Sequence, residues 1–286
     1  MATAAEADPW KGWEDAPKLI DDVERCAELR TFQFEDCDDD LQFISDLTFR
    51  LLGVEGSSIS SMEEDQQTVF ALTTRQTQWK KTQYPRKMPC SWTILRPKMT
   101  IVEDCENDAM WSKHPSVKLN YMKMYCGVPL TTSKGHNIGS FCLWDVQPRK
   151  VTETEETFLR YMGSLCVKLL EIHRIRRASL SHSWGKSETK DWPSMTRRRV
   201  ETSTLAEALS ELMLRNLQNE QNRGGSIESS IEYYARAIQF LEIRGMLNQE
   251  EFAQKLTENG GPVSMTLLWK IYKANLSSHD FEMTPQ

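Results

Sequence analysis

One stretch, residues 124–149, restricts the fold more than any other part of the chain. Residues 124–130 alternate like a strand, a Ser-Lys-Gly sequence typical of a tight turn follows, and residues 137–145 form a second apolar run. Both runs are apolar on both faces, which indicates strands that are covered on both sides. We therefore expect a hairpin in the middle of a sheet, with Gly127 and Gly139 leaving room for a backbone or a ligand to approach closely.

The overall composition limits the class of protein. The 286 residues carry a net charge of −6, with 27% charged and 39% hydrophobic residues, which is an ordinary soluble balance and disfavours nonspecific nucleic-acid binding. No apolar run approaches the roughly 20 residues that span a bilayer, and the first ten residues lack the regions of a signal peptide. The seven cysteines are odd in number and show no CxxC spacing, so we expect reduced thiols in a cytoplasmic or nuclear protein.

The segment before the first strand is expected to be helical. Residues 1–14 are small, polar and acidic and are predicted to be disordered. Pro17 can open a helix that runs to Leu29, and a second helix carries apolar residues from 41 to 52 and ends at Gly53. The acidic run at residues 35–40 either caps this second helix or binds a cation, but it lacks the glycine and the distal glutamate of a calcium loop. Capping is the expected role, and no metal site is predicted.

The middle of the chain alternates strands with long connections. Strands are expected at residues 54–62, 68–74 and 99–103, with one helical turn at 89–95. The basic segment 75–98 includes Trp79, Tyr84 and Trp92, a pattern that can bind single strands of nucleic acid, although a solvated loop fits the acidic chain better. Residues 106–120 read as a structured connection that crosses one face of the sheet before the hairpin, the kind of segment on which sites are built.

After the hairpin, the sequence Thr-Glu-Thr-Glu at residues 152–155 is a capping box, and an apolar stripe from 158 to 170 predicts a helix ending near His173. This helix either packs on the sheet or continues outward as a signalling or dimerising stalk. Residues 176–200 form a basic linker, which serves as a tether, a nuclear address or a contact for an acidic partner. Within the sequence Arg-Arg-Ala-Ser, Ser179 is a candidate phosphorylation site for basophilic kinases.

Residues 201–286 are predicted to be a small all-helical interaction region. Helices are expected to begin at residues 204, 227, 248 and 265, and their apolar stripes are too short to be buried singly. They must therefore pack together, on the first domain or on another chain. Residues 238–259 resemble a short pair of oligomerisation helices, so a homodimer or a protein partner is expected through the helical segments.

Three segments resemble, in the right order, the motifs of the GAF domain, a small-molecule sensor and dimerisation module of many signalling proteins. Residues 124–130 resemble its aromatic-Tyr-small-Gly-small-Pro-Leu strand, and residues 135–149 resemble its hairpin, which ends in Asp-x-x-Pro-Arg. Residues 101–115 resemble its segment with two aspartates before a proline, and residues 90–95 stand where many relatives have Cys-Ala-His-Thr-Ile. The similarity covers about residues 20–175, within a predicted domain of residues 15–175.

The resemblance implies an α+β fold. A central antiparallel sheet of about six strands, as in GAF and PAS domains, would carry helices from both ends of the domain on one face. A ligand pocket would lie under the long connection on the other face. Any ligand would then lie among seven residues, namely Cys90, Trp92, Asp104, Asp108, Trp111, Tyr125 and Trp144.

The candidate site departs from the family pattern at two positions. Trp92 replaces the family's histidine, and Trp111 replaces a smaller aromatic or basic residue, so these indoles either stack on a planar ligand or fill the cavity. Asp104, Asp108 and Asp145 either contact a ligand or cap turns, Asp145 beside Arg149. No Cys-His pair of the kind that anchors a bilin is present, so the cofactor, if there is one, stays unknown.

Two classes of function remain open. The first is a non-enzymatic signalling or regulatory protein with a sensor domain and a helical partner-binding region, because no complete catalytic set is present. The alternative is a thiol-dependent enzyme of the methionine sulfoxide reductase type, with Cys90 or Cys126 as nucleophile. Neither cysteine has a recognisable spacing to His114 or His136.

Overall fold

The computed structural model describes residues 10–182, 202–224 and 226–259, together with residues 264, 266, 267 and 270. The chain divides into two compact units, one with Met1–Thr152 and Met162–Ser187, the other with Glu153–Tyr161 and Glu188–Gln286. The predictions for residues 1–9, for the basic linker from 183 onward and for most of the last helix lie outside the described residues. Within the described ranges, no helix is both long and apolar enough to cross a membrane.

The first unit contains a six-stranded antiparallel sheet, which confirms the predicted α+β class. The strand order is β3-β2-β1-β6-β5-β4, and the strands are β1 (Gly56–Met62), β2 (Gln66–Thr74), β3 (Gln83–Pro85), β4 (Thr100–Val102), β5 (Met124–Thr131) and β6 (Asn137–Asp145). The hairpin of β5 and β6 lies inside the sheet as expected, and nearly all of its residues are buried. Strand β3 was missed, because three residues at a sheet edge, one of them proline, carry no strand pattern.

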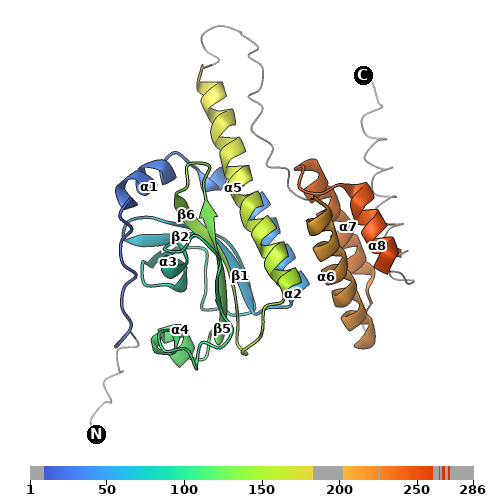
Figure 1. Ribbon diagram of the computed structural model, residues 1–286, viewed down its shortest axis with the longest axis horizontal. Coiled ribbons are helices and arrows are strands. Elements are labelled where there is room, and N and C mark those ends of the chain that lie inside the picture. The colour runs from blue at the N-terminus through green and yellow to red at the C-terminus, as the bar shows by residue number, and fades with distance from the viewer. Residues whose placement is uncertain are drawn as a thin grey trace. The chain divides into compact units, whose positions relative to one another are not determined.

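One face of the sheet is covered by α2 (Asp38–Leu52) and by α5 (Glu153–His182), as Figure 1 shows. Helix α2 packs on β1 and β2 and ends at Gly53, whose φ of 63° is left-handed, as the sequence predicted. In α5, Gly163 lies against β5 so closely that a Cβ there would be 2.7 Å from Val128 Cγ1. The helix reaches His182, so residues 176–182, predicted as part of the linker, are helical.

The opposite face is covered by short elements from the long connections (Figure 1). These are α3 (Pro89–Thr93), the 3₁₀ turn η2 (Trp111–Lys113) and α4 (Pro115–Lys118). Together with the strands they enclose a second core of tryptophans, cysteines and aliphatic residues, which contains Trp13, Trp111, Tyr125 and Trp144. The segment predicted as a structured connection therefore does cross this face of the sheet.

The N-terminal part differs from the prediction in two ways. Trp13 is only 8% exposed and belongs to the second core, so residues 10–14 are not disordered. Helix α1 (Asp22–Leu29) begins five residues after Pro17, and the 3₁₀ turn η1 (Phe34–Cys37) follows it. Ile20 and Val23 point to solvent, whereas Cys26, Leu29 and the ion-paired Arg25 are buried.

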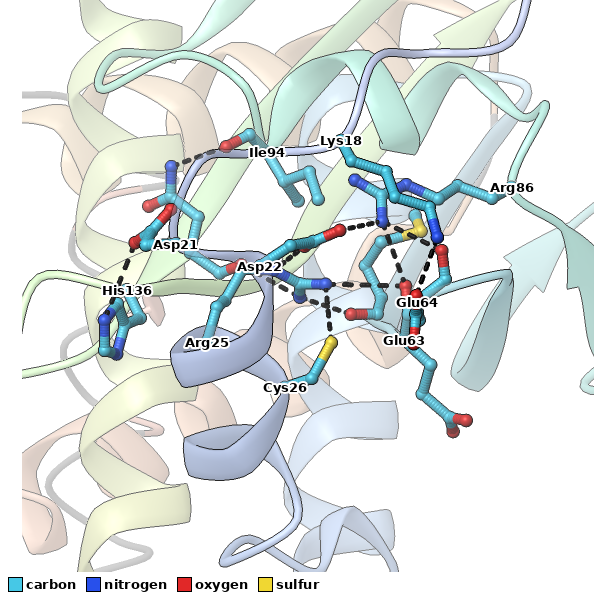
Figure 2. A network of polar contacts seen from close by, with 12 residues as sticks. Lys18, Asp21, Asp22, Arg25, Cys26, Glu63, Glu64, Arg86, Ile94 and His136 are labelled. Carbon is cyan, nitrogen blue, oxygen red and sulfur yellow. Dashed lines mark hydrogen bonds and ion pairs between the residues drawn. The ribbon is translucent and has the colours of Figure 1, made fainter.

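An ion-pair network joins α1 to the turn between β1 and β2 (Figure 2). The Asp22 carboxylate lies 2.7 Å from Arg25 Nε and 2.7 Å from Arg86 Nη1. Arg25 also donates to the carbonyl of Met62, and Arg86 donates to the carbonyl of Glu64 at 2.9 Å. The network therefore holds three separate segments together at one end of the second core.

The second unit contains α6 (Thr202–Asn222), α7 (Glu228–Ile243) and α8 (Gln249–Asn259). These helices agree with those predicted from residues 204, 227 and 248. Asn248 caps α8, because its Oδ1 accepts hydrogen bonds from the backbone of Glu250 and Glu251. The inward side chains of α6, α7 and α8 are fully buried, among them Leu205, Leu209, Leu212, Ile238, Phe252 and Leu256.

Candidate functional site

A cavity of about 60 Å³ lies on the face of the sheet that carries α3 and α4. Its apolar lining comes from Val69, Leu72, Trp79, Met88, Pro89, Met122 and Trp144, and its polar lining from Ser58, Gln67, Cys90, Ser116, Tyr125 and Cys142. Lys80 and Tyr84 complete the lining. Since Lys80 is exposed and Tyr84 half-buried, the cavity reaches the surface between β2 and β3.

Small residues on the central strands leave this space open. On β1, Gly56, Ser58 and Ser60 face the cavity side, and each pairs with a residue of β6. The Trp144 ring lies directly over Gly56, where a Cβ would be 2.1 Å from Cζ2 of the indole. Because these β1 side chains are short, the floor of the cavity is lower than a floor of valine or leucine would be.

Gln76 fixes the two indoles of the cavity wall. Its Oε1 accepts hydrogen bonds from Trp79 Nε1 at 2.6 Å and from Trp144 Nε1 at 3.3 Å, and its amide nitrogen donates to the Tyr121 carbonyl at 3.0 Å. The two rings meet edge to face with centroids 6.3 Å apart. Gln76 therefore holds the two indoles through contacts that lie outside the cavity. The part of the cavity surface that the two rings form is apolar.

Gln67 supplies an unsatisfied polar group in this lining. The residue is 3% exposed, and its Nε2 donates to Ser60 Oγ at 3.0 Å. Its Oε1 is buried and has no hydrogen-bond partner within the described structure. A buried carbonyl without a partner costs about 1–3 kcal/mol, so the position of Gln67 favours a bound group that donates a hydrogen bond.

Two thiols meet in the lining. Cys90 Sγ on α3 lies 3.5 Å from Cys142 Sγ on β6, Tyr125 Oη donates to Cys90 Sγ at 3.7 Å, and Ser58 Oγ lies 3.2 Å from Cys142 Sγ. Hydrogen bonds from Cys142 and Tyr125 lower the pKa of Cys90. The hydrogen bond to Cys90 and burial raise the pKa of Cys142. Cys90 is therefore the thiol of the pair that ionises first.

The structure places three of the seven predicted site residues, Cys90, Tyr125 and Trp144, in the cavity lining. Trp92 and Trp111 lie beside it, where Trp13 packs against both rings at centroid distances of 5.9 Å. Trp111 stacks on Tyr125 with a 5.0 Å separation. A separate hollow of about 230 Å³ lies next to Trp13 and Trp92. Trp13 of the N-terminal segment therefore packs against both indoles.

Asp104 and Asp108 hold turns. Asp104 Oδ1 accepts from the backbone nitrogens of Glu106 and Asn107, and Asp108 Oδ1 accepts from those of Met110 and Trp111. Neither carboxylate lines the cavity. They therefore position the connection above the sheet and present no charge to a ligand in the cavity.

Other predicted polar residues also make local contacts. Asp145 Oδ1 accepts from the Val146 nitrogen at 2.7 Å, and Arg149 donates to the Leu52 carbonyl at 2.9 Å. Ser179 is exposed on α5, and its hydroxyl donates to the Ile175 carbonyl at 3.0 Å. Among the described residues, no group of three or more His, Cys, Asp or Glu side chains could hold a metal ion.

Sequence reasoning missed Gln67, Gln76, Trp79 and Met122. Gln67 lies between two predicted strands, and Trp79 lies in the segment predicted as a solvated loop. The available signal was the run of serines in β1, since four serines in a strand buried along its whole length require polar partners. Gln67 is such a partner, through Ser60.

Comparison with known proteins agrees with the fold. Residues 36–170 match the model of the GAF domain family. The blue-light absorbing form of the PixJ GAF domain of Thermosynechococcus elongatus is 13% identical, with a TM-score of 0.45 over 59% of this chain and 99% of that one. The GAF domain of an Acinetobacter phosphoenolpyruvate-protein phosphotransferase is also 13% identical, with a TM-score of 0.41 over 58% and 95%.

A free methionine-R-sulfoxide reductase from Neisseria meningitidis is 14% identical, with a TM-score of 0.41 over 62% of this chain and 98% of that one. No curated protein matches the chain. The fold agrees with this family match. The strand order is β3-β2-β1-β6-β5-β4, the helices α2 and α5 lie on one face of the sheet, and the cavity lies on the other. Residues 36–170 of this chain belong to the GAF domain family.

Proposed function

We propose that this chain is a non-enzymatic regulatory protein whose GAF domain senses a small molecule. The observation that carries this proposal is the buried Gln67 Oε1, which has no hydrogen-bond partner among the described residues and lines the cavity. A ligand that donates one hydrogen bond to this oxygen would remove the cost of the unsatisfied carbonyl. Trp79, Met122 and Trp144 would enclose its apolar part.

The cavity volume limits the ligand. About 60 Å³ has room for a few water molecules or a molecule of a few heavy atoms, whereas pockets for drug-sized ligands measure roughly 300–1,000 Å³. A larger ligand therefore requires the half-buried side chains at the cavity mouth, Trp79, Tyr84 and Met88, to move aside. A nucleotide or a bilin does not fit the closed form.

The response would pass through helices. Ligand binding would shift the balance between two arrangements of α5 in a homodimer, and the helices of residues 202–259 would bind a protein partner. All seven cysteines are free thiols, which supports a cytoplasmic location.

Native mass spectrometry of the protein purified from its own host tests the proposal, because it reports bound molecules and oligomeric state together. We expect a small molecule to remain bound to a dimer and to be lost in Gln67→Leu, which removes the acceptor. Gln66→Leu is the matched control, since Gln66 is a neighbour whose amide donates to Glu63 at the surface. A monomer that is free of ligand, or equal binding by both variants, contradicts the proposal.

A second candidate is a thiol-dependent reductase, which the contact between Cys90 and Cys142 favours. The cavity is smaller than an amino acid such as methionine sulfoxide needs, so this function would require the cavity to open. An assay of sulfoxide reduction with the wild type, Cys90→Ser and Cys126→Ser distinguishes the two. Activity that disappears with Cys90→Ser supports the reductase, and inactivity of the wild type supports the sensor.

A further inference from the structure

Cys90 and Cys142 come from parts of the chain that lie 52 residues apart, yet their sulfur atoms are 3.5 Å from each other. A disulfide needs about 2.05 Å between the sulfurs, so a shift of about 1.5 Å would close the bond. Cys90 lies in the short, five-residue helix α3. Cys142 lies on the inner strand β6, which is fixed by hydrogen bonds to β1 and β5. The shift therefore falls on α3.

Both sulfurs line the cavity, which connects them with the surface near Lys80. The cavity has room for a molecule as small as hydrogen peroxide. Two other buried cysteines lack this activation, because burial raises the pKa of both Cys37 and Cys105 to about 12. Neither of these two thiols lines the cavity.

We propose that Cys90 and Cys142 are a peroxide-reactive thiol pair that closes to a disulfide inside the GAF cavity. Cys90 is the attacking sulfur, because Tyr125 Oη donates a hydrogen bond to it and the Cys142 thiol, 3.5 Å away, can donate a second one to its thiolate. Thr93 Oγ1 lies 2.8 Å from Tyr125 Oη and holds the phenol in place. Cys142 is the resolving thiol.

The chemistry balances with a hydroperoxide as the oxidant. The Cys90 thiolate attacks one oxygen of the O–O bond, which breaks to give a sulfenic acid and an alcohol, or water from hydrogen peroxide. The sulfur of Cys142 then attacks Cys90 Sγ, the S–S bond forms, and the sulfenic oxygen leaves as water. The two thiol hydrogens end in the alcohol and the water, and the two sulfurs are oxidised by two electrons in total.

Closure of the disulfide would change the site itself, because it would tie α3 to β6 across the cavity floor. The inference depends on the proposed function only in that it uses the same cavity. It gives that cavity a defined stimulus, an oxidant, which acts on residues of the chain and need not stay bound.

The test is peptide mapping by mass spectrometry under non-reducing conditions, on full-length protein that was first fully reduced and then treated with hydrogen peroxide. We expect a crosslinked peptide that joins Cys90 to Cys142, lighter by two hydrogens and reversed by dithiothreitol. Cys90 should lose its free thiol at least about tenfold faster than Cys105 or Cys166, in line with its greater thiolate fraction. This comparison needs no variant.

Two variants assign the roles of the pair. In Cys142→Ser the crosslink should be absent, and dimedone should trap a sulfenic acid on Cys90, whereas Cys90→Ser should lose both products. Cys105→Ser, which removes a buried thiol outside the cavity, is the matched control and should keep the crosslink. Oxidation of Cys90 no faster than that of Cys166, or a crosslink between other cysteines, overturns the inference. The sensor function is tested separately, by ligand retention in the reduced protein. Failure of the thiol-pair inference therefore does not decide whether the cavity binds a small molecule, and the reverse also holds.

Discussion

His114 is fully buried at the start of α4, with the Trp13 ring edge to face at 4.6 Å. Its Nδ1 accepts a hydrogen bond from the Ser116 nitrogen at 3.0 Å, so the imidazole caps the helix in its neutral form. Burial lowers the pKa of His114 to about 4, from an ordinary value of 6.5. An aromatic cap of this kind is sensitive to acid.

We expect the free energy of unfolding to fall as the pH drops from 6.5 to 4. In this pH range His114 is protonated in the unfolded chain but neutral in the folded protein. The full effect of this group is about 3 kcal/mol, at 1.36 kcal/mol for each pKa unit. His114→Asn keeps a capping oxygen and has no proton to gain, so its free energy of unfolding should be lower at pH 7 but flatter across this range. Urea unfolding at several pH values checks this, and an unchanged slope in the variant would refute the role of His114.

Gly139 and Gly127 test the close approaches in the central hairpin, which the sequence predicted. A Cβ at Gly139 would lie 2.1 Å from the backbone oxygen of Ser60, and a Cβ at Gly127 would lie 2.3 Å from the side-chain oxygen of Thr93. A backbone atom cannot rotate away, whereas a side chain can. We therefore expect Gly139→Ala to destabilise by about 3 kcal/mol and Gly127→Ala by about 1 kcal/mol, measured by urea unfolding. The reverse order would mean that α3 holds Thr93 more rigidly than β1 holds Ser60.

At this scale the sequence predicted apolar and glycine positions better than polar ones. Tyr125 and Trp144 were assigned to the site because they lie in a recognisable strand motif. Gln67 and Ser58 carry no such motif, and their importance follows from burial, which only the tertiary structure shows. Trp13 was missed for a related reason, because two tryptophans in an acidic, polar segment give no periodic signal.

Among the elements, α1 shows that an ion pair can place a charged residue on the buried face of a helix. Burial raises the pKa of the Asp22 carboxyl, but hydrogen bonds from Arg86 and Arg25 outweigh this effect and lower the pKa overall. The folded pKa therefore lies below the ordinary value of 3.8, so the pair stabilises the fold above about pH 4 and loses this contribution as the pH falls further. The pH range in which Asp22 affects stability therefore lies below the range in which His114 does.

Asp22→Asn should cost about 3–5 kcal/mol at neutral pH, because it leaves two buried guanidinium groups without their counter-charge. The variant should also lose the part of the acid sensitivity that appears below about pH 4. Glu64→Gln is the control, since Glu64 pairs with Lys18 at 2.7 Å on the exposed surface, and it should change thermal stability little. Equal effects of the two substitutions would show that the network in Figure 2 contributes no more than a surface pair.

The strands and helices of the first unit were predictable where they had enough residues to show a periodic spacing of apolar side chains. The hairpin, α2 and the start of α5 satisfied this condition. Helix α1 satisfied it in part, because its end at Leu29 was predicted, but its buried face includes Arg25 while Ile20 and Val23 point to solvent. Short elements such as β3 take their form from the neighbouring strand.

For the whole molecule, the family motifs extended over enough of the chain to predict the GAF domain and its two faces. They did not predict that Trp13 packs into the second core, because the N-terminal segment lies outside the family motifs. The C-terminal helices were predicted from their apolar stripes, and the structure shows a buried core of their own, with Leu212 and Phe252 fully enclosed. Each unit therefore has the core that independent cooperative unfolding requires.

Phe252→Ala tests this separation. The ring is fully buried in α8, which packs on α6, so its removal should cost the C-terminal unit about 3–5 kcal/mol. Hydrogen exchange followed by mass spectrometry should show faster exchange in peptides from α6, α7 and α8 and unchanged exchange in peptides from β1, β5 and β6. Gly139→Ala should give the opposite pattern, because its clash lies between β6 and β1. If either substitution accelerates exchange equally in both sets of peptides, the two units unfold as one.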